Sequence, residues 1–385
     1  AFGPAPGVIR LSANENPYGP SPKALEAIAE AAGKGAYYAG APYRELTARI
    51  AAANGLEPEN VVITSGSSSV LQATGRAYSK QGALLLPELT FDGPLRYSER
   101  LGAELRRIPL AADMDTDLDA MAAAVDDDVA MVYVCNPNNP TGIAIDPTKL
   151  RAFCRKVGKQ APVLIDEAYN ELTDVPEEAS MADLVREGEN VVVTRTFSKI
   201  FGLAGLRIGY ALAPAEHAEM IRRHTMSQSN VAGLAAALAS YEDEAFLEFS
   251  KAKVVEGRQM VMDVFDRHEV PYLPSQTNFV YGDIGRDADV FQQLMRERNV
   301  HIRGIYRDYT TWVAREHGPH RGPRGLRPRV PRGVHGLIHA RPSSPSRSRG
   351  ARGRPPFPSL PGFRTLLAGT RHRTCTGIAT RQRRP

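Results

Sequence analysis

The sequence predicts an α/β protein whose mostly parallel β-sheet is covered by helices on both faces, followed by a second, smaller domain. Short continuous apolar runs of strand length alternate with amphipathic helical segments, a pattern typical of parallel strands buried on both faces. Polar clusters follow the apolar runs, where the carboxyl ends of parallel strands collect ligands. From about residue 213 the pattern becomes mainly helical, which indicates a change of domain.

Five apolar runs are predicted as strands and lie in the first part of the chain, at 61–66, 82–87, 130–137, 161–169 and 190–199. Helical patterns at 68–80 and 147–159 separate some of them, as crossover helices separate parallel strands. In the second part we expect one or two long helices over 233–268, a strand within 272–284, a helix over 289–300 and a short strand within 300–305.

Composition excludes several classes of protein. The chain has 385 residues, of which 42% are hydrophobic and 24% charged, as expected for a globular protein of one or two domains. No apolar run approaches the roughly 18 residues of a membrane span, so no membrane partner is expected. The three cysteines, Cys135, Cys154 and Cys375, are scattered. They indicate neither a disulfide framework nor a metal site.

The net charge of +5 combines two very different parts. Residues 313–385 hold 17 arginines and one acid, so they carry 17 − 1 = +16, and residues 1–312 carry 5 − 16 = −11. An acidic body argues against nucleic acid as a partner.

The run TRTFSKIFGLAGLRIGY (194–210) predicts a nucleophilic amine beside a phosphate cradle. Lys199 follows a buried strand, where low dielectric disfavours its charge and suits Schiff-base formation. A surface lysine lying along apolar surface is the alternative. Its neighbours favour the first reading, because they supply hydroxyls, an anion-binding fork and tight turns: Thr196, Ser198, Arg207, Gly202, Gly205 and Gly209.

Asp166 ends the apolar run of VLIDEAY. A buried carboxylate needs a partner, and a protonated pyridine nitrogen would serve, with Tyr169 near enough to hydrogen-bond a phenolate oxygen. The alternative is an N-cap of the next helix.

Three further motifs supply candidate ligand groups. Pro137 and Pro140 restrict the backbone around Asn139, which would present amide donors at a strand end. SGSSS (65–69) precedes a helix, where it would bind a phosphate or simply cap the helix. Phe91 would stack on a planar ring or belong to the core.

The order of these motifs resembles that of fold-type-I pyridoxal-phosphate (PLP) aminotransferases of class I/II, and LSANENPYGPSP (11–22) is most similar to the histidinol-phosphate aminotransferase-like branch. The resemblance covers about residues 8–312. It implies a large domain with a seven-stranded-type sheet, and a smaller α+β domain formed by both chain ends. It also implies ping-pong transfer of an amino group through PLP.

The resemblance implies a role for each site residue. Lys199 would form the aldimine and carry the proton, and Asp166 would hold the ring nitrogen protonated. The other cofactor-binding residues would be Ser67, Ser68, Phe91, Asn139, Tyr169, Thr196, Ser198 and Arg207. Tyr38 would reach the cofactor phosphate of a neighbouring subunit, which implies a homodimer with shared sites. The substrate would contact Asn14, Tyr18 and Arg303.

The chain end departs from the family. Residues 313–385 are rich in Arg, Pro, Gly and Ser, a composition typical of disorder. The family has there a strand with the arginine that binds the substrate α-carboxylate. Back-translation of 313–327 with G/C-rich codons, read one base later, gives SRVSMGRIEDLEGFV, which resembles that strand. We therefore hypothesise a one-base frame error near codon 313, which sequencing of the gene tests; a genuine basic extension is the alternative.

These observations predict four segments: 1–35 in the small domain and active-site loop, 36–245 as the PLP-binding domain, 246–312 as a truncated small domain, and the 313–385 tail. The predicted function is transfer of an amino group between an α-amino acid, or an amino-alcohol phosphate, and a 2-oxo acid. The alternatives are a PLP-dependent lyase or decarboxylase, and a cofactor-binding protein whose catalysis the altered end impairs. A cytoplasmic location is expected. Export of the folded protein to the periplasm is the alternative, because the chain starts at Ala1.

Overall fold

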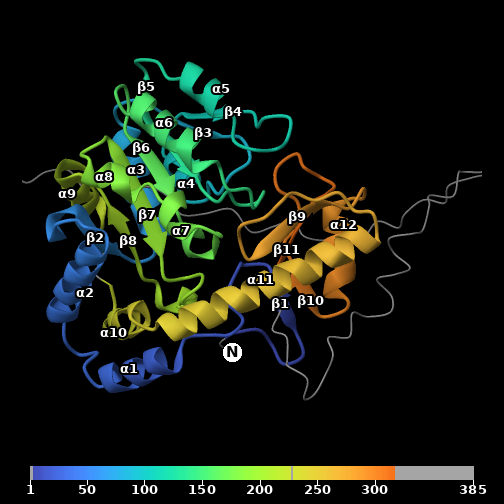
Figure 1. Cartoon of the computed structure of the whole chain (residues 1–385), viewed down its shortest axis with the longest axis horizontal. Helices are drawn as coiled ribbons and strands as arrows, with labels where there is room; N and C mark the ends of the chain where they lie inside the picture. Colours follow the sequence, from blue (N-terminus) through green and yellow to red (C-terminus); the bar gives the residue numbers. More distant parts are fainter. Residues whose placement is uncertain (1–2, 227–228, 317–385) are drawn as a thin grey trace, which may run out of the picture. The chain divides into compact units, whose positions relative to one another are not determined.

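The computed structural model describes residues 3–226 and 229–316 (Figure 1). Its main sheet has seven strands in the order β2-β8-β7-β6-β5-β3-β4. Strand β8 runs antiparallel to both of its neighbours, and the other pairings are parallel. The strands are β2 (Val61–Thr64), β3 (Ala83–Pro87), β4 (Leu105–Ile108), β5 (Val129–Cys135), β6 (Val163–Asp166), β7 (Val191–Thr196) and β8 (Gly209–Leu212).

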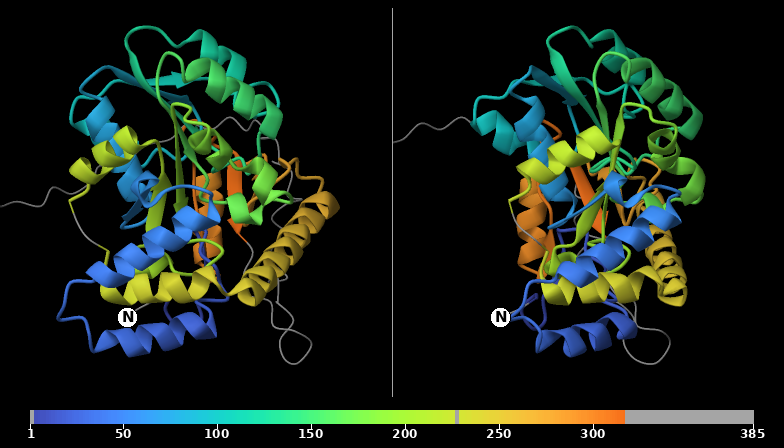
Figure 2. Two further views of the ribbon diagram at one scale, coloured as in Figure 1. Left: turned by 60° about the vertical axis from the view of Figure 1, so that its left-hand side comes forward. Right: turned by 90° about the vertical axis from the view of Figure 1, so that its left-hand side faces the viewer.

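Side chains alternate between two cores, one on each face of this sheet. In β6, Val163 and Ile165 belong to one core and Leu164 to the other, as the period of two in a strand requires. Helices α3 (Ser67–Tyr78), α4 (Leu95–Arg100) and α9 (Ala215–His224) supply side chains to the core that holds Leu164. Helices α2 (Gly40–Ala53), α6 (Pro147–Val157), α8 (Ala182–Arg186) and α10 (Val231–Tyr241) supply the opposite core. The sheet is therefore the central layer between two helical layers, and Figure 2 shows helices on either side of it.

Local capping explains where several helices begin. At the start of α6 the Asp146 side chain accepts a hydrogen bond from the Lys149 N–H. At the start of α1 (Pro22–Ala32) the Ser21 side chain accepts one from the Ala24 N–H. A proline follows each of these residues. These are the preferred N-cap residues followed by proline at the first helical position. The remaining short helices are α5 (Leu118–Ala123), α7 (Pro176–Ala179), η1 (Pro58–Asn60), η2 (Asn170–Leu172) and η3 (Ala204–Leu206).

A smaller α+β region combines both ends of the described chain. Strand β1 (Ile9–Leu11) pairs in parallel with β10 (Val300–Ile302), and β9 (Phe279–Asp283) pairs antiparallel with β11 (Trp312–Glu316). Helix α11 (Glu244–Arg267) packs against β9 and β11, and α12 (Ala288–Arg296) packs against β10. This region brings residues 12–15 close to the carboxyl ends of the strands of the main sheet.

The predicted fold class is confirmed, and the five predicted strands lie at β2, β3, β5, β6 and β7. The prediction omits β4, whose LRRI run carries two arginines and is only partly buried, and β8, which follows directly on the glycine-rich motif. One boundary differs: Val313–Glu316 belongs to strand β11 instead of the predicted tail, because this run pairs with β9 over its whole length and buries Val313, Ala314 and Glu316. The rest of that tail, with Cys375, lies outside the described residues.

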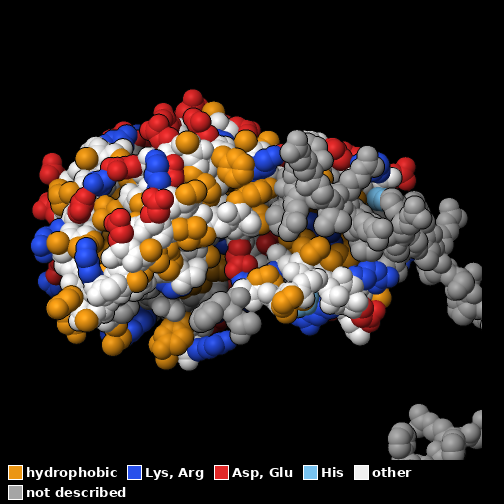
Figure 3. All heavy atoms as spheres, turned by 90° about the horizontal axis from the view of Figure 1, so that it is seen from below, with side chains coloured by type: hydrophobic (Ala, Val, Ile, Leu, Met, Phe, Trp, Pro, Cys, Tyr) orange, Lys and Arg blue, Asp and Glu red, His pale blue; other side chains and the backbone are white. Residues whose placement is uncertain are grey.

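Charged side chains are mixed on the surface. On the face drawn in Figure 3, acidic, basic and apolar groups are interspersed over the main body. No helix in the described part of the chain combines the length and apolarity needed to cross a membrane.

Candidate active site

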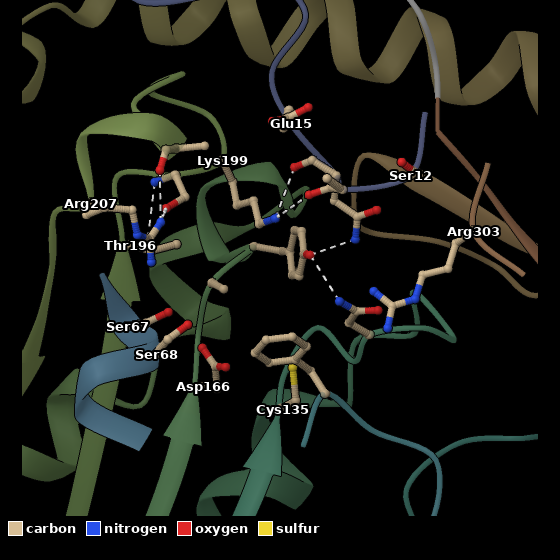
Figure 4. Close-up of a pocket in the computed structure, with 18 residues that line it drawn as sticks. Ser12, Glu15, Ser67, Ser68, Cys135, Asp166, Thr196, Lys199, Arg207 and Arg303 are labelled. Atoms are coloured by element: carbon tan, nitrogen blue, oxygen red, sulfur yellow. Dashed lines mark hydrogen bonds between the residues drawn. The ribbon is translucent and has the colours of Figure 1, made fainter. Parts of the chain in front are cut away.

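A cavity of about 230 Å³ lies at the carboxyl ends of the central strands (Figure 4). Strands β2, β5, β6 and β7 run in one direction, because β8 is antiparallel to both β2 and β7. Their ends therefore meet at one edge of the sheet. The sequence-predicted residues that line the cavity are Asn14, Ser67, Ser68, Phe91, Asn139, Asp166, Tyr169, Thr196, Ser198, Lys199, Arg207 and Arg303.

Asp166 is the last residue of β6 and is almost fully buried. Its Oδ2 accepts a hydrogen bond from the Tyr133 hydroxyl at 3.3 Å, while its Oδ1 has no hydrogen-bond partner within the described part of the chain. Burial raises the pKa of Asp166 to about 7, and the Tyr133 hydroxyl opposes that rise. A buried carboxylate oxygen without a partner is costly, so this atom fits a positively charged or N–H-bearing ligand group.

Lys199 lies just beyond the end of β7 and is half-buried. Its Nζ donates to the carbonyl oxygens of Ala13 at 3.2 Å and Asn14 at 3.0 Å. The same nitrogen lies 5.3 Å from the centroid of the Tyr169 ring. Burial lowers the pKa of Lys199 to about 8, so a sizeable fraction of this amine is neutral and nucleophilic near neutral pH.

One side of the cavity is built for an anion. Figure 4 places Arg207, Ser67 and Ser68 together on that side and Arg303 on the opposite side. Arg207 donates to the Ser198 hydroxyl at 3.3 Å, and the Thr196 and Ser198 hydroxyls are 2.8 Å apart. Ser67 opens α3, so the positive end of this helix faces the same place.

Two glycines let the backbone approach this anion site closely. Gly66, at φ +82°, caps α3, and a Cβ there would lie 2.3 Å from the Arg207 guanidinium. A Cβ on Gly209 would lie 2.4 Å from the Ser67 backbone nitrogen. The clash at Gly209 is with backbone that cannot move aside, and the positive φ of Gly66 strains any other residue, so the cradle requires glycine at both positions.

The Tyr169 hydroxyl accepts hydrogen bonds from two side-chain amides. Asn14 donates to it at 2.8 Å and Asn139 at 3.3 Å. The neighbouring Asn138 is a structural residue, since its amide donates to the Leu89 carbonyl oxygen at 3.0 Å and accepts from Thr90 at 2.8 Å. Of the two asparagines in this loop, only Asn139 lines the cavity.

Two predicted site residues do not line the cavity. Tyr38 is 95% exposed on the surface. Tyr18 packs its ring edge-on against Phe249, with 5.4 Å between the ring centroids. Tyr18 stands within the LSANENPYGP motif, the one feature that indicates it, and it is not among the residues that line the cavity.

Sequence reasoning missed several residues of the site. The roof of the cavity consists of the segment Ser12–Glu15, of which the sequence analysis identifies only Asn14. Cys135 lines the floor at the end of β5, and Tyr133 contacts Asp166 from the same strand. The two β5 residues alternate with core valines in an apolar run, a pattern that gives no separate signal for either one.

The donor set defines the class of ligand that fits. An unpartnered buried carboxylate oxygen suits a protonated ring nitrogen, Phe91 offers an aromatic face, and the helix end with Arg207 suits a phosphate. A half-buried amine with a lowered pKa completes the arrangement. The fold and site thus define an α/β enzyme for a phosphorylated pyridine aldehyde.

Comparison with known proteins agrees with this class. The family model described as aminotransferase class I and II matches residues 6–315, and the chain belongs to this family. It is 37% identical over 310 residues to a histidinol-phosphate aminotransferase of Halalkalibacterium halodurans, covering 80% of this chain and 84% of that protein. A histidinol-phosphate aminotransferase of Akkermansia muciniphila is 36% identical over 305 residues, covering 77% of this chain and 81% of that protein.

A solved structure shares the fold. The histidinol-phosphate aminotransferase of Sinorhizobium meliloti in complex with pyridoxal-5'-phosphate superposes with a TM-score of 0.73 at 30% identity, covering 81% of this chain and 86% of that one. The chain is therefore a PLP-dependent aminotransferase that resembles the histidinol-phosphate branch.

Proposed function

We propose that this aminotransferase moves an amino group between an α-amino acid, or an amino-alcohol phosphate, and a 2-oxo acid, with Lys199 as the reacting amine. One observation carries the proposal: a single cavity holds both the unpartnered Oδ1 of Asp166 and the Lys199 amine, whose pKa is lowered. When bound, PLP supplies an aldehyde for amines and a ring that withdraws electrons.

In this proposal each side chain has one task. Asp166 pairs with the ring nitrogen and keeps it protonated, which favours electron withdrawal. Arg207, with the Ser67 and Ser68 end of α3, binds the phosphate. Tyr169, with Asn139 at 3.3 Å, binds the ring hydroxyl. Lys199 then moves a proton at the carbon that bears the amino group, since its neutral form accepts that proton near pH 8.

The opposite side of the cavity supports an anionic substrate group. Arg303 lines this side, and its guanidinium lies 4.7 Å from the centroid of the Tyr306 ring. Within residues 3–226 and 229–316 no carboxylate forms an ion pair with Arg303, so its charge remains for a ligand. A carboxylate or a phosphate fits a guanidinium. The names of the relatives make histidinol phosphate one candidate donor.

A homodimer with shared sites is the proposed assembly. Exposed apolar side chains support it, since Tyr37 is 75%, Tyr38 95% and Met226 90% exposed. Surfaces of this kind often form interfaces. In such a dimer Tyr38 would reach the cofactor phosphate of the partner.

The test is an amino-donor panel on the full chain loaded with PLP. Donors would include the common amino acids and histidinol phosphate, with 2-oxoglutarate as the acceptor, and both products would be quantified. We expect equal amounts of new oxo compound and glutamate. Lys199→Ala should lower the rate by roughly 1,000-fold or more, since it removes the reacting group. The matched control is Lys149→Ala on α6, which should keep the wild-type rate.

Two outcomes would contradict the proposal. Release of carbon dioxide or an elimination product without consumption of 2-oxoglutarate would assign a lyase or decarboxylase instead. An active Lys199→Ala protein would show that another group transfers the proton.

A further inference from the structure

The backbone of Ala13 and Asn14 is the part of the cavity roof that contacts Lys199. Both carbonyl oxygens accept from its Nζ, at 3.2 and 3.0 Å. Asn14 has a left-handed backbone, with φ 53°, which is uncommon for a residue other than glycine and needs support from its surroundings. Its side chain donates to the Tyr169 hydroxyl at 2.8 Å. The backbone position of Asn14 therefore affects both the contact with Lys199 and the contact with Tyr169.

That support comes from the far end of the described chain. An oxygen of the Glu316 carboxylate accepts a hydrogen bond from the Asn14 backbone N–H at 2.6 Å. Glu316 is only 6% exposed, and a buried carboxylate of this kind is costly unless its hydrogen bonds are worth more than its lost hydration. It does not itself line the cavity.

Strand pairing places Glu316 accurately. It stands opposite Phe279 in the antiparallel β9–β11 pair. The Phe279 ring packs edge-on against Tyr169, with the ring centroids 5.5 Å apart. The Glu316 carboxylate is thus carried by β11, which is paired with β9, the strand that contacts Tyr169. The packing of these two strands therefore sets the distance between Glu316 and Asn14.

We propose that Glu316 is a positioning residue for Lys199: its carboxylate holds the Ala13–Asn14 peptide group through the Asn14 N–H, and thereby fixes the backbone that presents the Ala13 and Asn14 carbonyl oxygens to the lysine amine. The inference rests on the proposed role of Lys199 as the reacting amine. It applies to the chain as given, in which position 316 is Glu; under the frame error hypothesised from the sequence, that position holds another residue. Carbonyl oxygens that accept from an ammonium stabilise the charged form and fix its direction. Loss of this support should leave the amine less protonated and less precisely placed.

The groups around Lys199 set the direction of the expected change. Burial lowers its pKa most, Glu316 and Asp166 raise it, Arg207 lowers it, and Cys135 raises it. Burial also raises the pKa of Glu316 to about 7, against the backbone N–H of Asn14 and the charge of Lys199. Removing the Glu316 carboxylate, or breaking its hydrogen bond to the Asn14 N–H, should therefore lower the pKa of Lys199 further.

The experiment measures the amine directly in the cofactor-free, full-length protein. Trace acetic anhydride would be applied between pH 6 and pH 10, and mass spectrometry would compare acetylation of Lys199 with that of the exposed Lys23. The pH midpoint reports the pKa of Lys199. Two variants separate reach from charge, since Glu316→Asp keeps the charge but is one methylene shorter, while Glu316→Gln keeps an acceptor oxygen and loses the charge. Glu187→Gln, a surface carboxylate paired with Arg155, is the matched control.

We expect Glu316→Asp to lower the Lys199 midpoint by about one pH unit, with a smaller decrease in Glu316→Gln and none in the control. A wild-type midpoint in Glu316→Asp, with circular dichroism unchanged, would overturn the proposal. A decrease confined to Glu316→Gln would overturn it as well, because charge alone would then be responsible. Since acetylation is read without cofactor, these outcomes are independent of whether Lys199→Ala retains transaminase activity.

Discussion

At the residue scale, two ionisable groups in one cavity are shifted in opposite directions by the same cause. Burial raises the pKa of Asp166 to about 7 and lowers that of Lys199 to about 8. Without a ligand, both groups prefer their neutral forms more than in water. A ligand with a ring nitrogen and an aldehyde would give the Asp166 carboxyl group and the Lys199 amine a partner each. Binding would therefore offset the free energy that their burial costs. Function at this site is therefore expected to lower the stability of the cofactor-free protein.

The variant Asp166→Asn tests this trade-off. Because the folded-state pKa of Asp166 is raised above its unfolded value, its contribution to stability is full below about pH 4 and is lost as the pH rises through about 7. We expect Asn, which is never charged, to raise the melting temperature of the cofactor-free protein at pH 8 by a few °C. Little difference is expected at pH 4.

Thermal melts at the two pH values, with a transaminase assay beside them, provide the measurement. Activity should fall by roughly 100-fold or more, since the proposed partner of the ring nitrogen is lost. A variant that is less stable than wild type at pH 8 would argue against a costly buried charge.

At the scale of elements, the anion side of the cavity depends on how closely β8 approaches the start of α3. No side chain intervenes, because Gly209 faces the Ser67 nitrogen and Gly66 turns the chain at positive φ. The helix dipole acts within about one turn, so a displacement of the first residues of α3 weakens it at the ligand.

The variant Gly209→Ala should displace the start of α3, since its Cβ would lie 2.4 Å from a backbone nitrogen that cannot rotate away. We expect the affinity for PLP to fall by about tenfold or more, equivalent to about 1.4 kcal/mol. Absorbance titration of the cofactor-free protein gives this number. The matched control is Gly205→Ala, because nothing lies within 4 Å of a Cβ there. Equal affinities in both variants would show that the close approach is not needed.

At the scale of the whole molecule, contacts between distant parts of the chain complete the site. Strand β1 pairs with β10, and the Asn14 N–H reaches Glu316, 302 positions away. The cavity is lined by residues 12–15, by residues at the ends of the central strands and by Arg303, and the last described strand supports it through Glu316. The proposed dimer would add Tyr38 of a partner to that set.

The variant Tyr38→Phe tests the shared site. In a dimer it should lower PLP affinity by roughly tenfold, the value of one hydrogen bond to a charged group, without changing the mass measured by sedimentation. Tyr97→Phe, another exposed tyrosine at 46%, is the control. A monomer that binds PLP with wild-type affinity would contradict the assembly.

Much of the site could be predicted from sequence because its residues are local to strand ends. Asp166, Lys199 and Asn139 follow apolar runs, and parallel strands bring such ends together whatever the loops do. Arg207 and the glycines around it belong to the same continuous motif. In contrast, only their place in a motif indicates Tyr18 and Tyr38, neither follows a predicted strand, and neither lines the cavity.

Hydrophobic period and strand ends are local properties, so the sequence alone predicts the α/β sheet and places most candidate site residues at one edge of it. Long-range packing, in contrast, places Ser12–Glu15 over the cavity, the Tyr133 hydroxyl on Asp166 and the Glu316 carboxylate on the Asn14 N–H. These contacts join residues far apart in the chain. Their geometry depends on how β1, β9 and β11 pack, and no local pattern encodes that packing.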